Sequence, residues 1–182
     1  EKADFDKYPY QTQDTSEADA LAKDTSVKRA NNKLIIKLEN GKERILTSNL
    51  NDEENFIDYS YIANYPAIKR KGFFLSYYEG SGFALINTLT GDSMITWSAP
   101  AISPDNKYMI TASMDLVAAF DPNGFELYSI NDSNITKIGE LNLEKWGPGL
   151  VQWINNQTLI SEYITINDDG NTQVQYVKMV MQ

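Results

Sequence analysis

Short apolar runs separated by turn residues fill the chain from Leu34 onward. The first run, residues 34–38, leads to Asn40-Gly41, the dipeptide preferred in type I′ hairpin turns because both central positions need a positive φ. Residues 44–47 then return as the partner strand. This alternation of β-forming runs and turn residues predicts a β-hairpin.

The same hairpin pattern recurs twice further along the chain. Residues 83–97 contain two runs around a turn at Gly91, and residues 125–138 contain two runs around an Asn-Asp-Ser-Asn turn. The sequence Gly-Phe-Ala-Leu that begins at Gly82 matches Gly-Phe-Glu-Leu at Gly124, an offset of 42 residues. We therefore expect repeated hairpin units.

Each hairpin is followed by a second pair of runs, so four strands per unit is the predicted count. The second pairs cover residues 100–112 and 149–163, and the first unit reaches its equivalent at residues 73–78, after a longer insertion spanning residues 51–71. The C-terminal run, residues 172–180, would start a fourth unit or pair back onto an earlier sheet.

This organisation predicts an all-β protein in which four-stranded antiparallel units form a small propeller-like array, with a β-sandwich as the alternative. Residues 1–32 are polar and are expected to form an N-terminal tail or tether, in which Ser16 caps a short helix over residues 17–22. The all-β domain covers residues 33–182. Its predicted units are residues 33–81, 82–123 and 124–171, followed by a closing strand at residues 172–182.

A resemblance to TolB-type and WD40-like β-propeller repeats lies in one turn, Ala101-Ile102-Ser103-Pro104-Asp105-Asn106-Lys107-Tyr108. Asn106 stands where those repeats usually carry Gly, and Asn tolerates the positive φ of that position. Residues 83–163, including Trp146-Gly147-Pro148, also resemble an uncharacterised family of exported bacterial proteins. This second resemblance implies a periplasmic or secreted location and implies no activity.

The composition restricts the classes of function. Acidic residues outnumber basic ones by 25 to 16, for a net charge of −9, so attraction to nucleic acid or to anionic lipid is not expected. The absence of Cys and His removes disulfides, Cys-rich zinc sites and every Ser-His or Cys-His catalytic arrangement. No apolar window approaches the roughly 20 residues of a spanning helix, so membrane insertion is not expected either. We expect no cofactor and no bound metal.

Aromatic residues are the main candidates for a binding surface. Tyr59, Tyr61 and Tyr65 lie in the insertion of the first unit, and a tyrosine offers a flat face and a hydroxyl at small entropic cost. Trp146 precedes a Gly-Pro break and is expected in a loop. We predict that these four residues bind a ligand. The alternative is a half-buried strand for the tyrosines and a core position for all three tryptophans.

Acidic clusters indicate a second kind of site. Asp115 and Asp121 flank an apolar run, and two carboxylates about 5 to 9 Å apart could perform the acid and base chemistry of a glycan hydrolase. Such a site would contain at least one carboxyl with a raised pKa. The turn Asp168-Asp169-Gly170 departs from the calcium-loop pattern, and a solvated hairpin turn explains it.

These observations predict a non-enzymatic exported interaction module that binds a protein or an envelope polysaccharide through the aromatic residues. A carboxylate-based glycan hydrolase is the first alternative. The second is an accessory or structural subunit whose open sheet edges pair with another chain. In each case the N-terminal tail could tether the protein in the periplasm or outside the cell.

Overall fold

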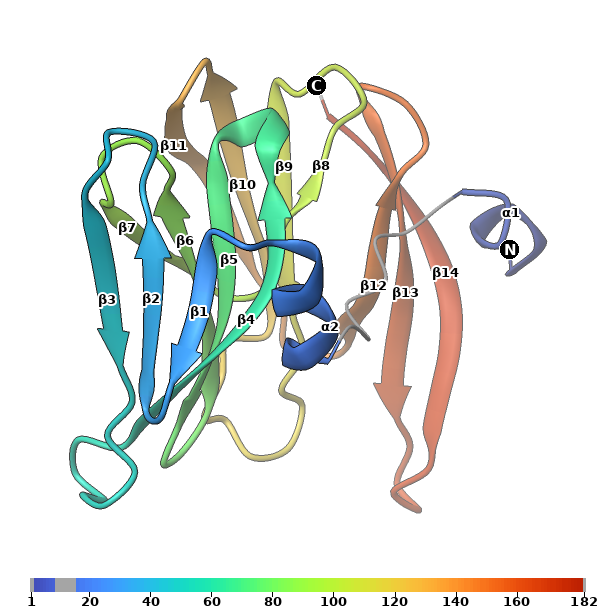
Figure 1. The fold of residues 1–182 in the computed structure, drawn as a ribbon. Helices are drawn as coiled ribbons and strands as arrows, with labels where there is room; N and C mark the ends of the chain where they lie inside the picture. The colour runs from blue at the N-terminus through green and yellow to red at the C-terminus, as the bar shows by residue number, and fades with distance from the viewer. Residues whose placement is uncertain (1, 9–15, 182) are drawn as a thin grey trace. The chain divides into compact units, whose positions relative to one another are not determined.

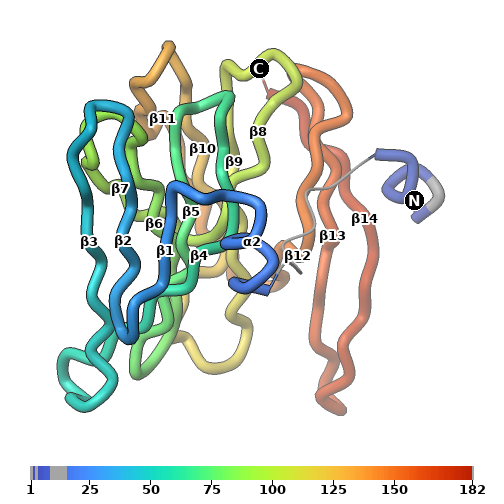
Figure 2. The backbone as a smooth tube through the Cα atoms, viewed as in Figure 1, coloured from blue at the N-terminus to red at the C-terminus, as the bar shows by residue number. Residues whose placement is uncertain are grey.

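The computed structural model describes residues 2–8 and 16–181, and these residues form an all-β protein with three short helices (Figure 1). The strands group into four antiparallel sheets, and each sheet is built from strands that follow one another in the chain (Figure 2). The prediction of an all-β fold made of antiparallel hairpins is therefore confirmed. The chain divides into two compact units, residues 12–96 and residues 97–182 together with residues 1–11. We call them the 12–96 unit and the 97–182 unit.

The 12–96 unit contains two sheets and a helix. Its helix α2 spans Glu17–Lys23, and a 3-10 turn, η1, spans Pro66–Ile68. The first sheet consists of β1 (Val27–Ala30), β2 (Lys33–Lys37) and β3 (Glu43–Thr47). The second sheet consists of β4 (Ile57–Tyr65), β5 (Arg70–Tyr77), β6 (Ser81–Asn87) and β7 (Ser93–Thr96).

The 97–182 unit also contains two sheets, and the N-terminal helix α1 (Lys2–Phe5) belongs to it. The third sheet consists of β8 (Ala101–Ile102), β9 (Tyr108–Ser113), β10 (Gly124–Asn131) and β11 (Asn134–Asn142). The fourth consists of β12 (Gly147–Trp153), β13 (Thr158–Ile166) and β14 (Thr172–Val180). No helix in the described part of the chain is long and apolar enough to cross a membrane.

Alternation of apolar and polar residues decides which side of each strand is buried in the 12–96 unit. In β2, Leu34 and Ile36 are completely buried, whereas Lys33 and Lys37 at the strand ends are exposed. They join one core cluster with residues of the second sheet, among them the completely buried Phe73. Because successive side chains of a strand point to opposite faces, this spacing fixes the inward face.

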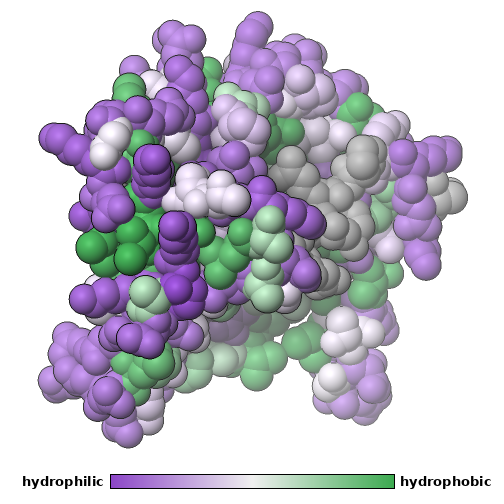
Figure 3. All heavy atoms as spheres, viewed as in Figure 1, coloured by the Kyte–Doolittle hydropathy of each residue, from purple (hydrophilic) through white to green (hydrophobic). Residues whose placement is uncertain are grey.

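The outer face of the first sheet carries some apolar surface of its own. Figure 3 shows apolar surface over β2 and β3. Ile35 and Ile45 are cross-strand neighbours there, and Ile45 is 47% exposed. Exposed apolar side chains are common in soluble proteins, because more than half of a folded protein's surface comes from apolar atoms.

The core of the 97–182 unit forms around one tryptophan. Trp153 is buried in a cluster with Ile110, Phe125 and Leu159. Its indole Nε1 donates a hydrogen bond to the carbonyl of Ala101 over 2.9 Å, so the polar edge of the ring is satisfied within the protein. The core position predicted for Trp153 is therefore confirmed.

The prediction that residues 1–32 form a tail is wrong for residues 17–30. Residues 17–30 contain α2 and β1, and β1 pairs with β2 to complete the first sheet. The predicted short helix is confirmed, since the Ser16 Oγ accepts a hydrogen bond from the backbone N–H of Asp19 over 3.2 Å. A helix of seven residues is marginal alone, and packing of its buried Ala20 into the core supports it.

The predicted unit boundaries also differ from the sheets. The boundary at 81/82 falls inside β6, and the boundary at 123/124 separates β9 from β10, although these two strands pair along six residue positions. Gly82 is the second residue of β6 and Gly124 the first residue of β10, and each of these strands is the third of its sheet in chain order. A turn motif identifies the two strands of a hairpin. Which neighbouring strands the hairpin then pairs with depends on the faces that are buried.

Three local predictions have different outcomes. Residues 57–65 form strand β4 and are therefore no insertion loop. At the first turn only Gly41 has a positive φ, +80°, and its N–H donates to the carbonyl of Leu38, which makes a type I turn followed by a left-handed glycine in place of type I′. Asn106 does adopt the positive φ expected for it, 57°.

Candidate functional site

The tyrosines predicted to bind a ligand lie in strand β4, and two of them are core residues. Tyr61 is 1% exposed, and its hydroxyl donates a hydrogen bond to Asp24 over 2.6 Å. Tyr65 is 5% exposed and packs edge-on against Phe83, with 6.3 Å between ring centroids. Burial raises the pKa of both hydroxyls. Tyr59 is half-buried against the same core. The prediction that these residues form an exposed loop face is therefore wrong.

Trp146 belongs to the 97–182 unit and is half-buried there. Its ring stacks on Tyr163 with 4.4 Å between centroids and an interplanar angle of 22°, and it meets Phe125 at a steep angle. These contacts extend the core cluster of that unit. The residue is only partly exposed, and the stacking partner of its ring is Tyr163 of the same unit.

The carboxylate of Asp115 is engaged by the loop that it begins. One oxygen accepts the backbone N–H groups of Val117 and Ala118, and the other accepts those of Phe120 and Asp121, at 2.8 to 3.2 Å. These donors hold the pKa of Asp115 far below its ordinary value. A general acid needs the opposite shift, so Asp115 anchors the loop and does not fit the hydrolase prediction.

A buried carboxylate of the same unit is likewise satisfied by the protein. Glu126 is 3% exposed, and one of its oxygens accepts the Trp97 backbone N–H and the Thr111 hydroxyl, each over 2.8 Å. The other oxygen accepts the Lys137 ammonium over 2.9 Å. With every partner supplied internally, this carboxylate stabilises the unit.

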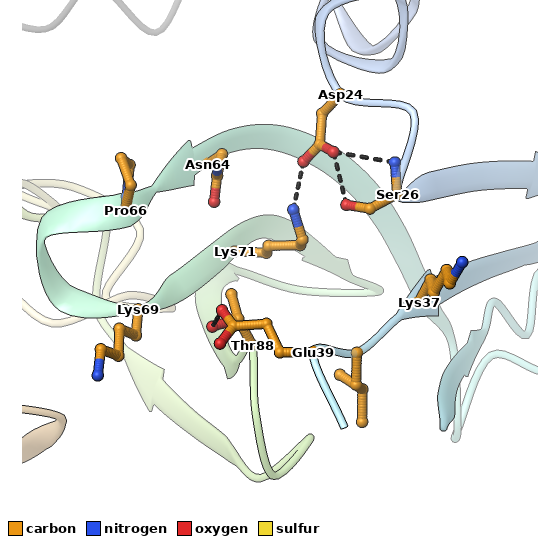
Figure 4. A pocket seen from close by; sticks show the side chains of 10 residues that line it. Asp24, Ser26, Lys37, Glu39, Asn64, Pro66, Lys69, Lys71 and Thr88 are labelled. Atoms are coloured by element: carbon orange, nitrogen blue, oxygen red, sulfur yellow. Dashed lines mark hydrogen bonds and ion pairs between the residues drawn. The ribbon is translucent and has the colours of Figure 1, made fainter. Parts of the chain in front are cut away.

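A pocket of about 630 Å³ opens in the 12–96 unit, and its size is that of a typical small-molecule site (Figure 4). Its residues come from the segment after α2, the end of β2 and the turn that follows it, β4, η1 and the residue after it, β5, and the residue after β6. They are mostly polar, and three are lysines. The lining residues are Asp24, Ser26, Lys37, Leu38, Glu39, Asn64, Pro66, Lys69, Lys71 and Thr88.

An ion pair between Lys71 and Asp24 lies at the inner side of this pocket. The Lys71 side chain is 6% exposed and the Asp24 side chain 15% exposed. Asp24 also accepts the Ser26 N–H over 3.0 Å, the Ser26 hydroxyl over 2.6 Å and the Tyr61 hydroxyl over 2.6 Å. Burial acts to raise the pKa of Asp24, but these hydrogen bonds outweigh it and lower the pKa to about 2.

Helix α2 positions Asp24 because both ends of the helix are bound to neighbouring strands. At its start, Glu17 accepts hydrogen bonds from the Arg29 guanidinium in β1 and from the backbone N–H of Tyr61 in β4. At its end, Asp24 is the C-cap residue, and its N–H donates to Ala20 over 3.2 Å. A carboxylate at a helix C-terminus is unfavourable, and the Lys71 ammonium compensates for it.

Backbone and side-chain hydrogen bonds fix the opposite side of the pocket. The Glu39 N–H donates to the carbonyl of Thr88 over 2.8 Å, and the Thr88 hydroxyl donates back to the Glu39 carboxylate. The Thr88 N–H donates to the carbonyl of Lys69 over 3.1 Å. Lys69 has a positive φ of 52°, an uncommon conformation for a residue with a side chain.

Two of the three lysines give the pocket positive charge. Lys37 and Lys69 are exposed, and within residues 2–8 and 16–181 neither ammonium lies within ion-pair distance of a carboxylate. Figure 4 shows them at opposite ends of the pocket, with Lys71 turned toward Asp24. The lining thus carries three lysines against the two carboxylates of Asp24 and Glu39, in a protein whose net charge is −9.

A comparison with protein-family models, with curated proteins and with solved structures finds no match. The described residues contain no group of three or more acidic side chains placed to hold a metal ion.

Sequence reasoning missed every residue of this pocket. One signal was present, because Lys69-Arg70-Lys71 places three basic residues together in an acidic chain. Asp24 lay in the segment interpreted as a tail, so its partnership with Lys71 had no local signature.

Proposed function

We propose that the protein is a non-enzymatic binding module whose pocket binds an acidic saccharide, a sugar that carries a carboxylate. The observation that supports this proposal is the charge arrangement of the pocket. Lys71 and Asp24 neutralise each other at its inner side. Lys37 and Lys69 lie at its ends, and neither ammonium is paired with a carboxylate of the described residues. Those two groups are available to a ligand carboxylate.

The remaining lining suits the hydroxyl groups and ring faces of a sugar. Asn64 offers an amide that both donates and accepts, and Glu39 offers a carboxylate acceptor. Pro66 and Leu38 add apolar surface for the C–H faces of a ring. A few placed polar groups in a partly apolar cavity are what orient a small ligand.

Binding without catalysis is favoured because the acidic groups near the pocket already have internal partners. Asp24 is held ionised by Lys71, Ser26 and Tyr61. The Glu39 carboxylate accepts a hydrogen bond from the Thr88 hydroxyl. A periplasmic or secreted location, proposed from the resemblance to exported proteins, would place an envelope polysaccharide within reach of the pocket.

We also propose that the four sheets are the blades of a small propeller. The support is their number and connectivity, since propellers have four to eight blades that are each a four-stranded sheet of consecutive strands. Two of the four sheets have four strands, and the other two have three. A β-sandwich is the alternative, and an experimental structure that shows whether the four sheets surround a common axis distinguishes the two.

The ligand proposal is tested by titrating the protein with an acidic disaccharide that contains a uronic acid, and with its neutral counterpart of the same linkage. We expect saturable binding of the acidic sugar only, followed by calorimetry or by NMR chemical shifts. Lys69→Ala and Lys37→Ala should each weaken binding about tenfold, the equivalent of one charge-assisted hydrogen bond.

Lys28→Ala is the matched control, because Lys28 is an exposed lysine of β1 outside the pocket, and binding should stay unchanged. Equal binding of the neutral and acidic sugars would contradict the role of the lysines. Binding of an acidic peptide in the absence of any sugar binding would overturn the proposed ligand class.

A further inference from the structure

The N-terminal segment, residues 2–8, packs on the fourth sheet as a peptide would pack on a receptor. It consists of α1 and a turn closed by hydrogen bonds from the Asp6 N–H to the carbonyl of Lys2 and from the Tyr8 N–H to that of Phe5. The segment and the sheet belong to the same compact unit. Asp4 and Lys178, which join them, are 174 positions apart in the sequence.

The register of the fourth sheet defines the face that the segment covers. Gln152 in β12 is paired with Ile160 in β13, which is paired with Lys178 in β14, so these side chains share one face. Tyr176 lies two positions before Lys178 and points to the same side. The neighbouring residue Trp153 points to the other side, into the core of the unit.

Two side chains of the segment are recognised by this face. Phe5 is 5% exposed, and its ring packs on Tyr176 with 5.0 Å between centroids and an interplanar angle of 43°. The Asp4 carboxylate pairs with the Lys178 ammonium over 3.2 Å. An aromatic anchor beside a charge pair selects a sequence in which an acidic residue directly precedes an aromatic one.

The main chain of the segment is recognised by Gln152, a polar side chain that is 2% exposed. With its amide oriented by its hydrogen-bond partners, the nitrogen lies 3.1 Å from the carbonyl oxygen of Phe5 and 2.8 Å from that of Tyr8. Both donor hydrogens of the amide can thus be used by backbone carbonyls. A buried amide that loses such partners costs about 1–3 kcal/mol, which favours an occupied site.

We propose that this face of β12–β14 is a peptide-recognition site, and that residues 2–8 are its internal occupant. Its external ligand is a peptide of the same chemistry, with an acidic residue directly before an aromatic residue, and it binds when it displaces the segment. The proposal does not depend on the saccharide pocket, which lies in the other unit.

The test uses the full chain and a fluorescently labelled peptide with the sequence of residues 2–8. The internal segment competes at an effective concentration on the order of 1 mM, so a peptide with an intrinsic dissociation constant of about 100 μM binds the unaltered chain roughly tenfold more weakly than it binds an open site. Phe5→Ala in the protein removes the internal anchor. We therefore expect the Phe5→Ala protein to bind the peptide about tenfold more tightly than the unaltered protein.

Controls separate recognition from non-specific binding. In the Phe5→Ala protein, Gln152→Leu should abolish peptide binding, whereas Gln157→Leu, in an exposed turn, should leave it unchanged. If Gln152→Leu unfolds the protein, as circular dichroism would show, Lys178→Ala provides the second variant and should weaken binding several-fold. A peptide with alanine in place of the phenylalanine should not bind.

Failure of the peptide to bind the Phe5→Ala protein would overturn the proposal and leave the segment a purely structural part of the 97–182 unit. Equal binding to the Gln152→Leu protein, if that variant is folded, would overturn it as well. A dimer of the unaltered chain that becomes monomeric on Phe5→Ala would assign the site to the segment of a second copy, and so would overturn the assignment to a partner peptide.

Discussion

The Asp24–Lys71 pair shows how a single contact can serve both folding and binding. Its two residues join the end of α2 to β5, and the hydroxyl of Tyr61 completes the network from β4. Removing one partner leaves the other charge buried, which is costly, whereas the intact pair is close to neutral in effect. The pair therefore holds the pocket in shape without attracting a second counter-ion.

Asp24→Asn should lower the free energy of unfolding at pH 7 by about 2 to 3 kcal/mol, because Lys71 loses its buried counter-charge. The pKa of Asp24 is lowered from its ordinary 3.8 to about 2, so the carboxylate stabilises the folded state above pH 4. This contribution disappears as the pH falls from about 4 to about 2. Urea unfolding of both proteins at a series of pH values measures the difference.

Glu43→Gln serves as the control for that series, because it removes an exposed carboxylate of β3 that has no part in the network. Its stability should differ little from that of the unaltered protein at each pH. The free energy of unfolding of Asp24→Asn is compared with that of the unaltered protein at each pH. If their difference stays constant from pH 7 to pH 2, the ion pair contributes nothing to stability.

At this scale the sequence predicted little of the candidate site. Asp24 and Lys71 are 47 residues apart, and nothing in the neighbourhood of either residue indicates the other. Tyr61 has both an apolar ring and a hydroxyl, so a tyrosine at this position could lie on the surface or in the core. Only the pairing of β4 with β5, which puts Tyr61 opposite Phe73, decides for the core.

At the scale of elements, the packing of aromatic rings explains why strand β5 has a glycine at position 72. A Cβ atom at Gly72 would lie 2.6 Å from ring atoms of both Phe83 and Tyr65. The two rings therefore close over the backbone of β5, and this contact explains why Tyr65 is buried. A strand glycine often marks such a close approach.

Gly72→Ala should destabilise the protein by about 1 to 3 kcal/mol, because two packed aromatic rings must move to admit the methyl group. Thermal or urea unfolding measures the loss. Gly82→Ala is the matched control in the adjacent strand β6, where the nearest atom, in the ring of Tyr77, would lie 3.4 Å away. We expect Gly82→Ala to change stability by less than about 1 kcal/mol, and equal losses from both variants would contradict this account.

Element type was predictable where local signals agree. Ser16 followed by acidic residues and alanines identifies α2, and alternating residues identify β2. The same rules failed for residues 57–65, because Ile57, Tyr59, Tyr61 and Tyr65 alternate imperfectly around a register shift between Tyr61 and Ala63. A bulge of this kind interrupts the two-residue period that identifies a strand.

At the scale of the whole molecule, each unit has its own hydrophobic core. One cluster is built from residues between Ala20 and Ile86, and the other from residues between Ile110 and Leu159 with their packed neighbours. The sequence predicted three units, whereas the structure has four sheets. The difference arises because β1, predicted to be part of the tail, belongs to the first sheet, and β4, predicted to be part of an insertion, belongs to the second. Which sheet a strand joins depends on its pairing with other segments, and the sequence of one strand alone does not reveal that pairing.

The separate cores predict separate unfolding steps. Trp97, Trp146 and Trp153 all lie in the 97–182 unit, so tryptophan fluorescence reports on that unit alone. Gly72→Ala should lower the urea midpoint measured by far-ultraviolet circular dichroism, which follows both units, and leave the fluorescence midpoint in place. Equal displacement of both midpoints would show that the two units unfold as one.

The contact between residues 2–8 and β14 also sets an order of assembly during synthesis. Each sheet uses consecutive strands, so its pairing can begin as soon as its own residues have been made. Residues 2–8 are made before any of the four sheets, but Lys178 follows Asp4 by 174 residues. Residues 2–8 are thus among the last of the described residues to reach their place, and until β14 is complete they can meet other molecules.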